Sequence, residues 1–168
     1  MEPIKILFLD IGGVLLSDGW NYSSREQAAQ KFGLEPIQYQ KDHAVAFPLF
    51  ENGKLSLDQY LESVIFNVNR DFSKQEFTDF MFSRTSQLPN FLPWLINWKK
   101  ETGIKIFAIN NEGKEFNDYR IKNFNLHDCF DAFISSCEVG VSKPDPAIFK
   151  LALGIAQVEA KNCLYFVD

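Results

Sequence analysis

Short runs of consecutive apolar residues, several of them β-branched, occur at both ends of the chain and predict buried β-strands. The four predicted strands are residues 4–9, 104–109, 130–135 and 163–167. Residues 115–124 and 146–156 have the composition and caps of helices and lie between the last three strands. Because strands that alternate with helices form a parallel sheet with helices on both faces, the pattern predicts an α/β, Rossmann-like fold.

The long stretch between the first two predicted strands shows only helical spacing. Within it, Ser56 and Ser73 each precede a Gln or Glu by three residues, which is the spacing of a capping box. Other helices are expected through Phe32, near Gln38–Ala46 and over Phe91–Thr102. We therefore expect a Rossmann-like core made of residues 1–15 and 96–168, with a helical cap at 16–95.

A polar side chain follows each predicted strand, directly or in the next loop. These side chains are Asp10, Asn110, Lys143 and Asp168. The C-terminal ends of parallel strands share one edge of a sheet, so the four groups are expected to meet there. Two carboxylates can hold a hard cation such as Mg²⁺, and the ammonium and amide groups can hold an anion. A carboxylate at this position can also attack the bound group.

Gly12 and Gly13 follow Asp10 almost at once. Glycine lets the backbone turn sharply and lets a ligand approach it closely. The two glycines therefore predict a substrate-binding turn directly after the first strand.

Composition narrows the classes of partner. The chain has 168 residues, 46% of them hydrophobic and 17 of them Phe, which predicts one folded domain with an aromatic core. The net charge of −5 gives no general attraction to nucleic acid or to an anionic membrane. Three cysteines without a C-x-x-C motif, and no secretory signal, are typical of reduced thiols in a cytoplasmic protein.

Four motifs in order resemble those of the haloacid dehalogenase-like (HAD) hydrolase superfamily. They are Asp10 with its Gly-Gly-Val turn, Ile-Asn-Asn at 109–111, Ser-Lys-Pro-Asp-Pro at 142–146, and Leu-Tyr-Phe-Val-Asp at 164–168. The helical insertion resembles the cap of the subgroup in which the cap follows the first strand. Its Phe-Glu-Asn-Gly-Lys-Leu-Ser segment at 50–56 is similar to that subgroup's cap.

This resemblance implies a Mg²⁺-dependent phosphatase acting on a small phosphorylated metabolite. Asp10 would be the nucleophile and would form an aspartyl-phosphate, while Lys143 would neutralise Asp10 and the phosphoryl group. The metal ligands would be the Asp10 and Asp168 carboxylates and the backbone carbonyl of Gly12. The substrate-binding residues would be Asn110, Asn111, Gly12 and Gly13.

Two positions depart from the family pattern and leave alternatives open. Gly12 stands where phosphatases of this family usually carry a second Asp as general acid and base, a contribution worth about 10²–10⁴-fold in rate. Asn110 stands where Ser or Thr is usual, and Asp18 is a less favoured replacement for the proton carrier. The alternatives are a haloacid dehalogenase, which needs no metal, and a non-catalytic member that binds a ligand or a partner.

The family normally continues beyond the fourth strand with another acidic residue, whereas nothing follows Asp168 here. Either the chain is a shortened form or a partner strand covers the outer edge of this strand. An uncovered apolar edge favours self-association.

Overall fold

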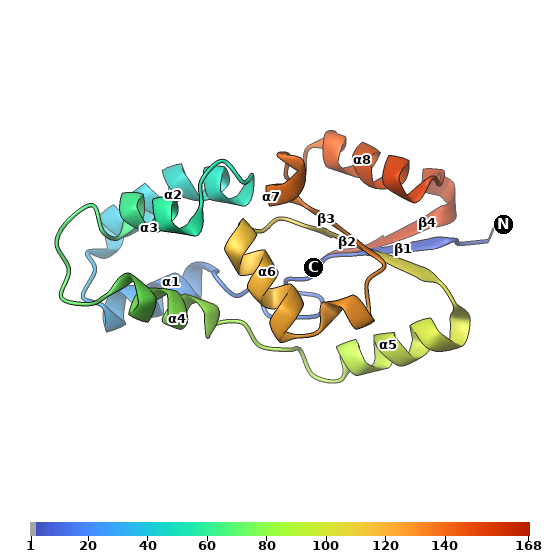
Figure 1. The fold of residues 1–168 in the computed structure, drawn as a ribbon, viewed down its shortest axis with the longest axis horizontal. Helices are drawn as coiled ribbons and strands as arrows, with labels where there is room; N and C mark the ends of the chain where they lie inside the picture. Colours follow the sequence, from blue (N-terminus) through green and yellow to red (C-terminus); the bar gives the residue numbers. More distant parts are fainter. Residues whose placement is uncertain (1–2) are drawn as a thin grey trace.

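Four parallel strands form the sheet in the computed structural model, which describes residues 3–168 (Figure 1). They are β1 (Ile6–Leu9), β2 (Lys105–Asn110), β3 (Ala132–Ser135) and β4 (Cys163–Phe166), in the spatial order β3-β2-β1-β4. β1 lies inside the sheet and pairs in parallel with both β2 and β4. The α/β, Rossmann-like architecture expected from the sequence is confirmed.

The two faces of the sheet are covered by different helices. On one face Phe8 packs with Ile148 of helix α8 (Pro146–Ala156). On the other face Leu9 packs with helix α5 (Phe91–Thr102). Alternate β1 side chains therefore serve opposite layers, which is the period-2 geometry of a strand, and Figure 1 shows α8 and α5 on opposite sides of the sheet.

The remaining elements of this region are short. They are α6 (Lys114–Asn123), α7 (Ser136–Val139) and the 3₁₀ helices η1 (Leu126–Asp128) and η2 (Ala160–Asn162). The one-turn helix α7 was not expected from the sequence, because four residues carry too little periodicity to be recognised.

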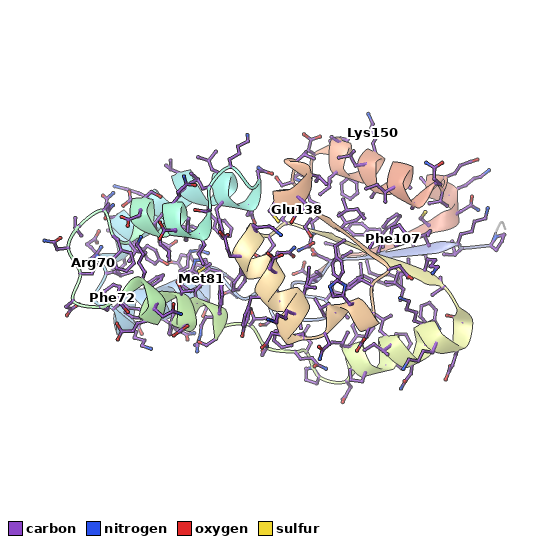
Figure 2. The ribbon with its side chains drawn as sticks, viewed as in Figure 1. Arg70, Phe72, Met81, Phe107, Glu138 and Lys150 are labelled. Atoms are coloured by element: carbon purple, nitrogen blue, oxygen red, sulfur yellow. The ribbon has the colours of Figure 1, made fainter. Side chains whose placement is uncertain are left out.

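The segment between β1 and α5 forms a separate helical region with its own core. Its helices are α1 (Tyr22–Lys31), α2 (Pro36–Glu51), α3 (Leu57–Val64) and α4 (Lys74–Phe82). Tyr60 and Phe77 are fully buried at its centre among other rings. Figure 2 shows Phe72 and Met81 in this region, well separated from Phe107 in the sheet.

Side-chain caps start the helices of this region. Both predicted capping boxes, at Ser56 and at Ser73, are confirmed. Helix α2 is longer than the expected Gln38–Ala46, because the Glu35 carboxylate caps a start at Pro36 and the helix continues through Pro48. A proline removes one backbone donor from the ladder without ending this helix.

The expected boundary between core and cap at residue 95 falls inside α5. Leu92 and Leu95 of that helix both pack in the sheet's hydrophobic cluster. The division therefore lies before Phe91 rather than within the helix.

Three further features concern membrane spanning, the cysteines and the edge of the sheet. No helix within residues 3–168 has the length and apolar character needed to cross a membrane. The three cysteines are unpaired, and Cys129 is the buried one. β4 lies at one edge of the sheet, with Leu164 and Phe166 exposed, and pairing of this edge with another chain stays a prediction.

Candidate active site

Asp10 stands directly after β1, and the C-terminal end of that strand points toward the helical region (Figure 1). One carboxylate oxygen accepts the backbone N–H of Ile11 at 2.7 Å, and the other is ion-paired with the Lys143 ammonium group. The two side chains are 13% and 14% exposed, so the pair is screened from bulk water but still reachable. A largely buried carboxylate with a fixed orientation and a cation beside it suits nucleophilic attack on an anionic group.

Asn111 fixes the backbone that carries Lys143. Its side-chain oxygen accepts the Lys143 N–H at 2.8 Å, and its side-chain nitrogen donates to the Lys143 carbonyl at 2.9 Å. The predicted Asn111 side chain thus contacts the lysine loop, and a direct role in binding substrate stays a prediction.

Asp168 lies over the turn that follows Asp10. Gly13 has φ +71°, and a β-carbon added to it would stand 2.3 Å from an Asp168 carboxylate oxygen. Only glycine combines this backbone conformation with so close a neighbour. Gly13 itself is not among the residues that line the cavity described below.

The donors near Asp10 fit Mg²⁺ in kind. Among residues 3–168, no group of three His, Cys, Asp or Glu side chains is arranged to hold a metal. The set implied by the family resemblance consists instead of two carboxylates, from Asp10 and Asp168, and the Gly12 carbonyl. Mg²⁺ is usually held by one or two carboxylates and completes its shell with water, so this oxygen set is sufficient in number and type.

Asn110 is held in a closed ring of hydrogen bonds. Its amide nitrogen donates to Asn117 at 2.9 Å, Asn117 donates to Ser135 at 3.1 Å, and Ser135 donates back to the Asn110 oxygen at 2.8 Å. Asn110 is 2% exposed. The ring joins β2, β3 and α6, and it leaves one amide N–H of Asn110 for the phosphate contact that the sequence predicts.

These groups surround a cavity of about 370 Å³ between the sheet edge and the helical region. Of the predicted site residues, its lining includes Asp10, Gly12, Asn110, Asn111, Lys143 and Asp168. The structure thus brings together groups that are far apart in the sequence, while their chemical roles stay predictions.

The helical region supplies the opposite wall of the cavity. Its contribution comprises Trp20, Asn21, Arg25, Phe47 and Glu51. Burial raises the pKa of the Glu51 carboxyl above its usual range, although the nearby Lys143 charge opposes that shift. Phe50, which follows Phe47 by one helical turn, is fully buried in the aromatic core and does not line the cavity.

His43 is buried in the helical region and does not line the cavity. The Trp20 indole N–H donates to the Tyr60 hydroxyl at 3.1 Å, and that hydroxyl lies 2.8 Å from the His43 Nδ1. Burial lowers the pKa of His43 to about 3, and the positive charge of Arg25 adds to the shift. The ring is therefore neutral, and its Nδ1 shares a hydrogen bond with the Tyr60 hydroxyl.

A buried ion pair between Arg120 and Glu112 lines the same cavity. The Arg120 Nη1 donates to Glu112 at 2.5 Å, and its Nη2 donates to the Ser17 carbonyl at 2.5 Å. Burial raises the pKa of Glu112 to about 7, and the Arg120 charge opposes that shift. The pair places a positive group beside Gly12, where the sequence provides no side chain.

Sequence reasoning missed this pair because charged residues on a helix are usually solvated. One signal was present: Arg120 lies four positions after Phe116 and three after Asn117, so the three residues share one face of α6. Since Phe116 is apolar, that face is the buried one, and a charge on it needs a partner.

One hydroxyl connects the two regions at the side of the cavity. Ser136 accepts the backbone N–H of Glu112 at 3.0 Å and donates to the carbonyl of Glu51, at the end of α2, at 2.6 Å. The loop after β2 and the helical region are thus fixed to the same side chain.

Comparison with known proteins agrees with this geometry. The model of the haloacid dehalogenase-like hydrolase family matches residues 4–168, which is nearly the whole chain. The protein therefore belongs to the haloacid dehalogenase-like hydrolases.

Several solved structures share the fold at low sequence identity. A HAD family enzyme from Bacteroides thetaiotaomicron, in complex with magnesium, has a TM-score of 0.82 and 20% identity, covering 98% of this chain and 83% of that one. A HAD-like family hydrolase from Porphyromonas gingivalis has a TM-score of 0.73 and 17% identity, with coverage of 98% and 82%. L-2-haloacid dehalogenase from Xanthobacter autotrophicus has a TM-score of 0.63 and 18% identity, with coverage of 96% and 69%.

Proposed function

We propose that this hydrolase is a Mg²⁺-dependent phosphatase that removes a phosphoryl group from a small metabolite through an aspartyl-phosphate on Asp10. The contact between Asp10 and Lys143 carries the proposal, because it places a nucleophile and a neutralising cation in one cavity. The B. thetaiotaomicron enzyme, which has also been solved with magnesium and inorganic phosphate, supports the metal and the substrate class.

In the proposed reaction the Asp10 carboxylate attacks phosphorus, and Lys143 shifts from Asp10 to the phosphoryl oxygens. The free amide N–H of Asn110 donates to one of those oxygens. Asp10, Asp168 and the Gly12 carbonyl would hold Mg²⁺, which when bound neutralises charge on the phosphoryl group. Positioning and charge neutralisation supply most of the catalysis in phosphoryl transfer, so these few groups suffice.

A panel of phosphate monoesters, assayed with Mg²⁺ and with a chelator, tests the proposal. Release of phosphate should require Mg²⁺ and should fall to background in Asp10→Asn, which keeps the shape of the nucleophile and removes its charge. Equal background release by the wild type and Asp10→Asn would contradict the phosphatase proposal.

A second candidate is haloacid dehalogenation, favoured by the absence of an acid at Gly12. The X. autotrophicus dehalogenase has been solved with chloropropionic acid covalently bound. Release of chloride from 2-chloropropionate, undiminished by a chelator, would support this function and exclude the phosphatase.

A further inference from the structure

The place left empty by Gly12 is faced by a guanidinium group. A β-carbon on residue 12 would stand 3.7 Å from both terminal nitrogens of Arg120. In the phosphatases that the chain resembles, the side chain at this position protonates the oxygen of the leaving group. Here the same space is bordered by a permanent positive charge that has no proton to give near neutral pH.

Arg120 is held rigidly in this position. It is 3% exposed, and its two terminal nitrogens are bonded to Glu112 and to the Ser17 carbonyl. Those bonds use two of the five N–H groups of a guanidinium, so donors remain for a ligand oxygen. A preorganised donor in a site screened from water stabilises a developing anion strongly.

We propose that Arg120 makes this site selective for phosphorylated compounds whose leaving group departs as a stable anion, such as acyl phosphates and phosphoanhydrides. The inference rests on the proposed phosphatase function and specifies its substrate class. Alkyl phosphates are poor substrates, because their leaving alkoxide needs a proton and Arg120 has none to give.

The chemistry balances without a general acid. The Asp10 oxygen forms a bond to phosphorus, and the bond from phosphorus to the leaving oxygen breaks. The electron pair stays on that oxygen, which leaves as an anion stabilised by Arg120. Water then attacks the aspartyl-phosphate, which releases inorganic phosphate and the Asp10 carboxylate, and the proton of the water passes to phosphate and solvent.

Two carboxyl groups near Arg120 are rival proton donors. Asp18 is exposed and lines the cavity, with its α-carbon 3.7 Å from the added β-carbon of residue 12. Glu112 is buried and paired with Arg120. If either group protonates the leaving group, replacing that carboxyl group with an amide will lower kcat/KM for alkyl phosphates selectively.

The first measurement compares leaving groups in the wild-type protein with Mg²⁺. We expect kcat/KM for acetyl phosphate and 4-nitrophenyl phosphate to exceed that for glycerol phosphate by about 10²-fold or more, the contribution of a missing general acid. Equal values for activated and alkyl phosphates would overturn the proposal.

The second measurement uses variants at position 12. Gly12→Asp and Gly12→Asn have the same size and differ in the ability to carry a proton, and a β-carbon fits the available space. Gly12→Asp should raise kcat/KM for glycerol phosphate at least about tenfold, as expected of a restored general acid, whereas Gly12→Asn should not. No gain in Gly12→Asp, or equal gains in both, would overturn the proposal.

The third measurement addresses the guanidinium and its rivals. The double variant Arg120→Met with Glu112→Gln removes both buried charges, so that neither is left unpaired. It should lose about 10²–10³-fold in kcat/KM for acetyl phosphate, with a smaller loss for glycerol phosphate. Should this variant fail to fold, as judged by circular dichroism, the first two measurements still decide.

Asp18→Asn is assayed alongside and should keep the ratio of acetyl phosphate to glycerol phosphate turnover, whereas Glu112→Gln, which removes the charge that pairs with Arg120, should lower acetyl phosphate turnover. A loss confined to glycerol phosphate turnover in either variant would assign the proton donor to that carboxyl group and overturn the proposal. If neither acetyl phosphate nor any phosphate ester is hydrolysed and Asp10→Asn behaves as the wild type, the proposed function itself fails. That outcome differs from activity with no preference for leaving group, which contradicts the role of Arg120 alone.

Discussion

The sheet region and the helical region meet at one cavity, but they place their side chains there by different means. Asp10, Asn110 and Asp168 are placed by the ends of paired strands, whose positions follow from backbone hydrogen bonds. Trp20 and Phe47 of the helical region are placed by contacts between aromatic rings. Backbone pairing tolerates many side chains, whereas ring packing depends on each ring, so substitutions in the aromatic core should disturb the second set of side chains and leave the first in place.

Removing one central ring of the helical region should have the largest effect, because it should destabilise that region and leave the sheet region folded. Phe77 is fully buried and packs edge-on against Trp20, so Phe77→Ala should lower the free energy of unfolding by about 3–5 kcal/mol. Chemical denaturation measures this loss, with Tyr22→Ala as the control because Tyr22 is an exposed ring in the same region. Hydrogen exchange should show α3 and α4 losing protection while β1 keeps it. A uniform loss would mean that the two regions unfold as one unit.

Loss of the cation in the sheet region should affect chemistry rather than packing. Lys143→Met should lower kcat/KM by about 10²–10³-fold, the usual effect of removing a group that stabilises developing charge. Lys150→Met is the matched control, since Lys150 points outward from α8 (Figure 2). Equal activity of the two variants would remove Lys143 from the site.

Adding one methyl group at the junction between the regions tests how tightly they pack against each other. A β-carbon on Gly113 would stand 2.1 Å from the Phe50 ring, so Gly113→Ala should destabilise the protein by about 1–3 kcal/mol through overpacking. Gly154→Ala in α8 meets nothing within 4 Å and should stabilise by up to about 1 kcal/mol, because alanine favours a helix. Thermal unfolding compares the two. A neutral Gly113→Ala would show that α6 and the helical region are not tightly packed.

The last prediction concerns the buried histidine of the helical region, whose effect is small at each single pH step. The pKa of His43 is about 3 in the folded protein against an ordinary value of 6.5. Between these values the unfolded chain binds a proton that the folded chain refuses, so the free energy of unfolding falls as the pH falls.

The variant His43→Gln cannot take up that proton. Its deficit in stability relative to the wild type should therefore shrink by up to about 1.4 kcal/mol for each pH unit below about 6. Urea denaturation at several pH values measures the difference. If the difference in stability between the two proteins stays constant with pH, His43 takes up its proton as readily in the folded protein as in the unfolded chain.

Local signals predicted the helices whose ends carry strong caps. Residues 91–102 and 146–156 were predicted with the bounds that the structure shows, because Gly103 ends the first helix with φ +68° and Asp145 caps the second. The length of α2 was not predicted, since Pro48 reads as a break in the sequence. Whether a helix tolerates a proline depends on the tertiary contacts around it.

The convergence of the site was predictable to the extent that it depends on topology. Parallel strands bring Asp10, Asn110 and Asp168 to one edge regardless of the other side chains. The pairing of Arg120 with Glu112 and the ring of bonds around Asn110 depend on how α6 packs on the sheet. A linear pattern of residues does not specify that packing.

The double contact between Asn111 and the Lys143 backbone bears on how the lysine exchanges partners. It anchors the root of the long side chain independently of the charge at its tip. In the proposed reaction, transfer of the ammonium group from Asp10 to an incoming phosphoryl group would therefore need only torsional changes along the four methylenes of Lys143. The loop would stay in place, and the reorganisation cost of each turnover would be correspondingly small.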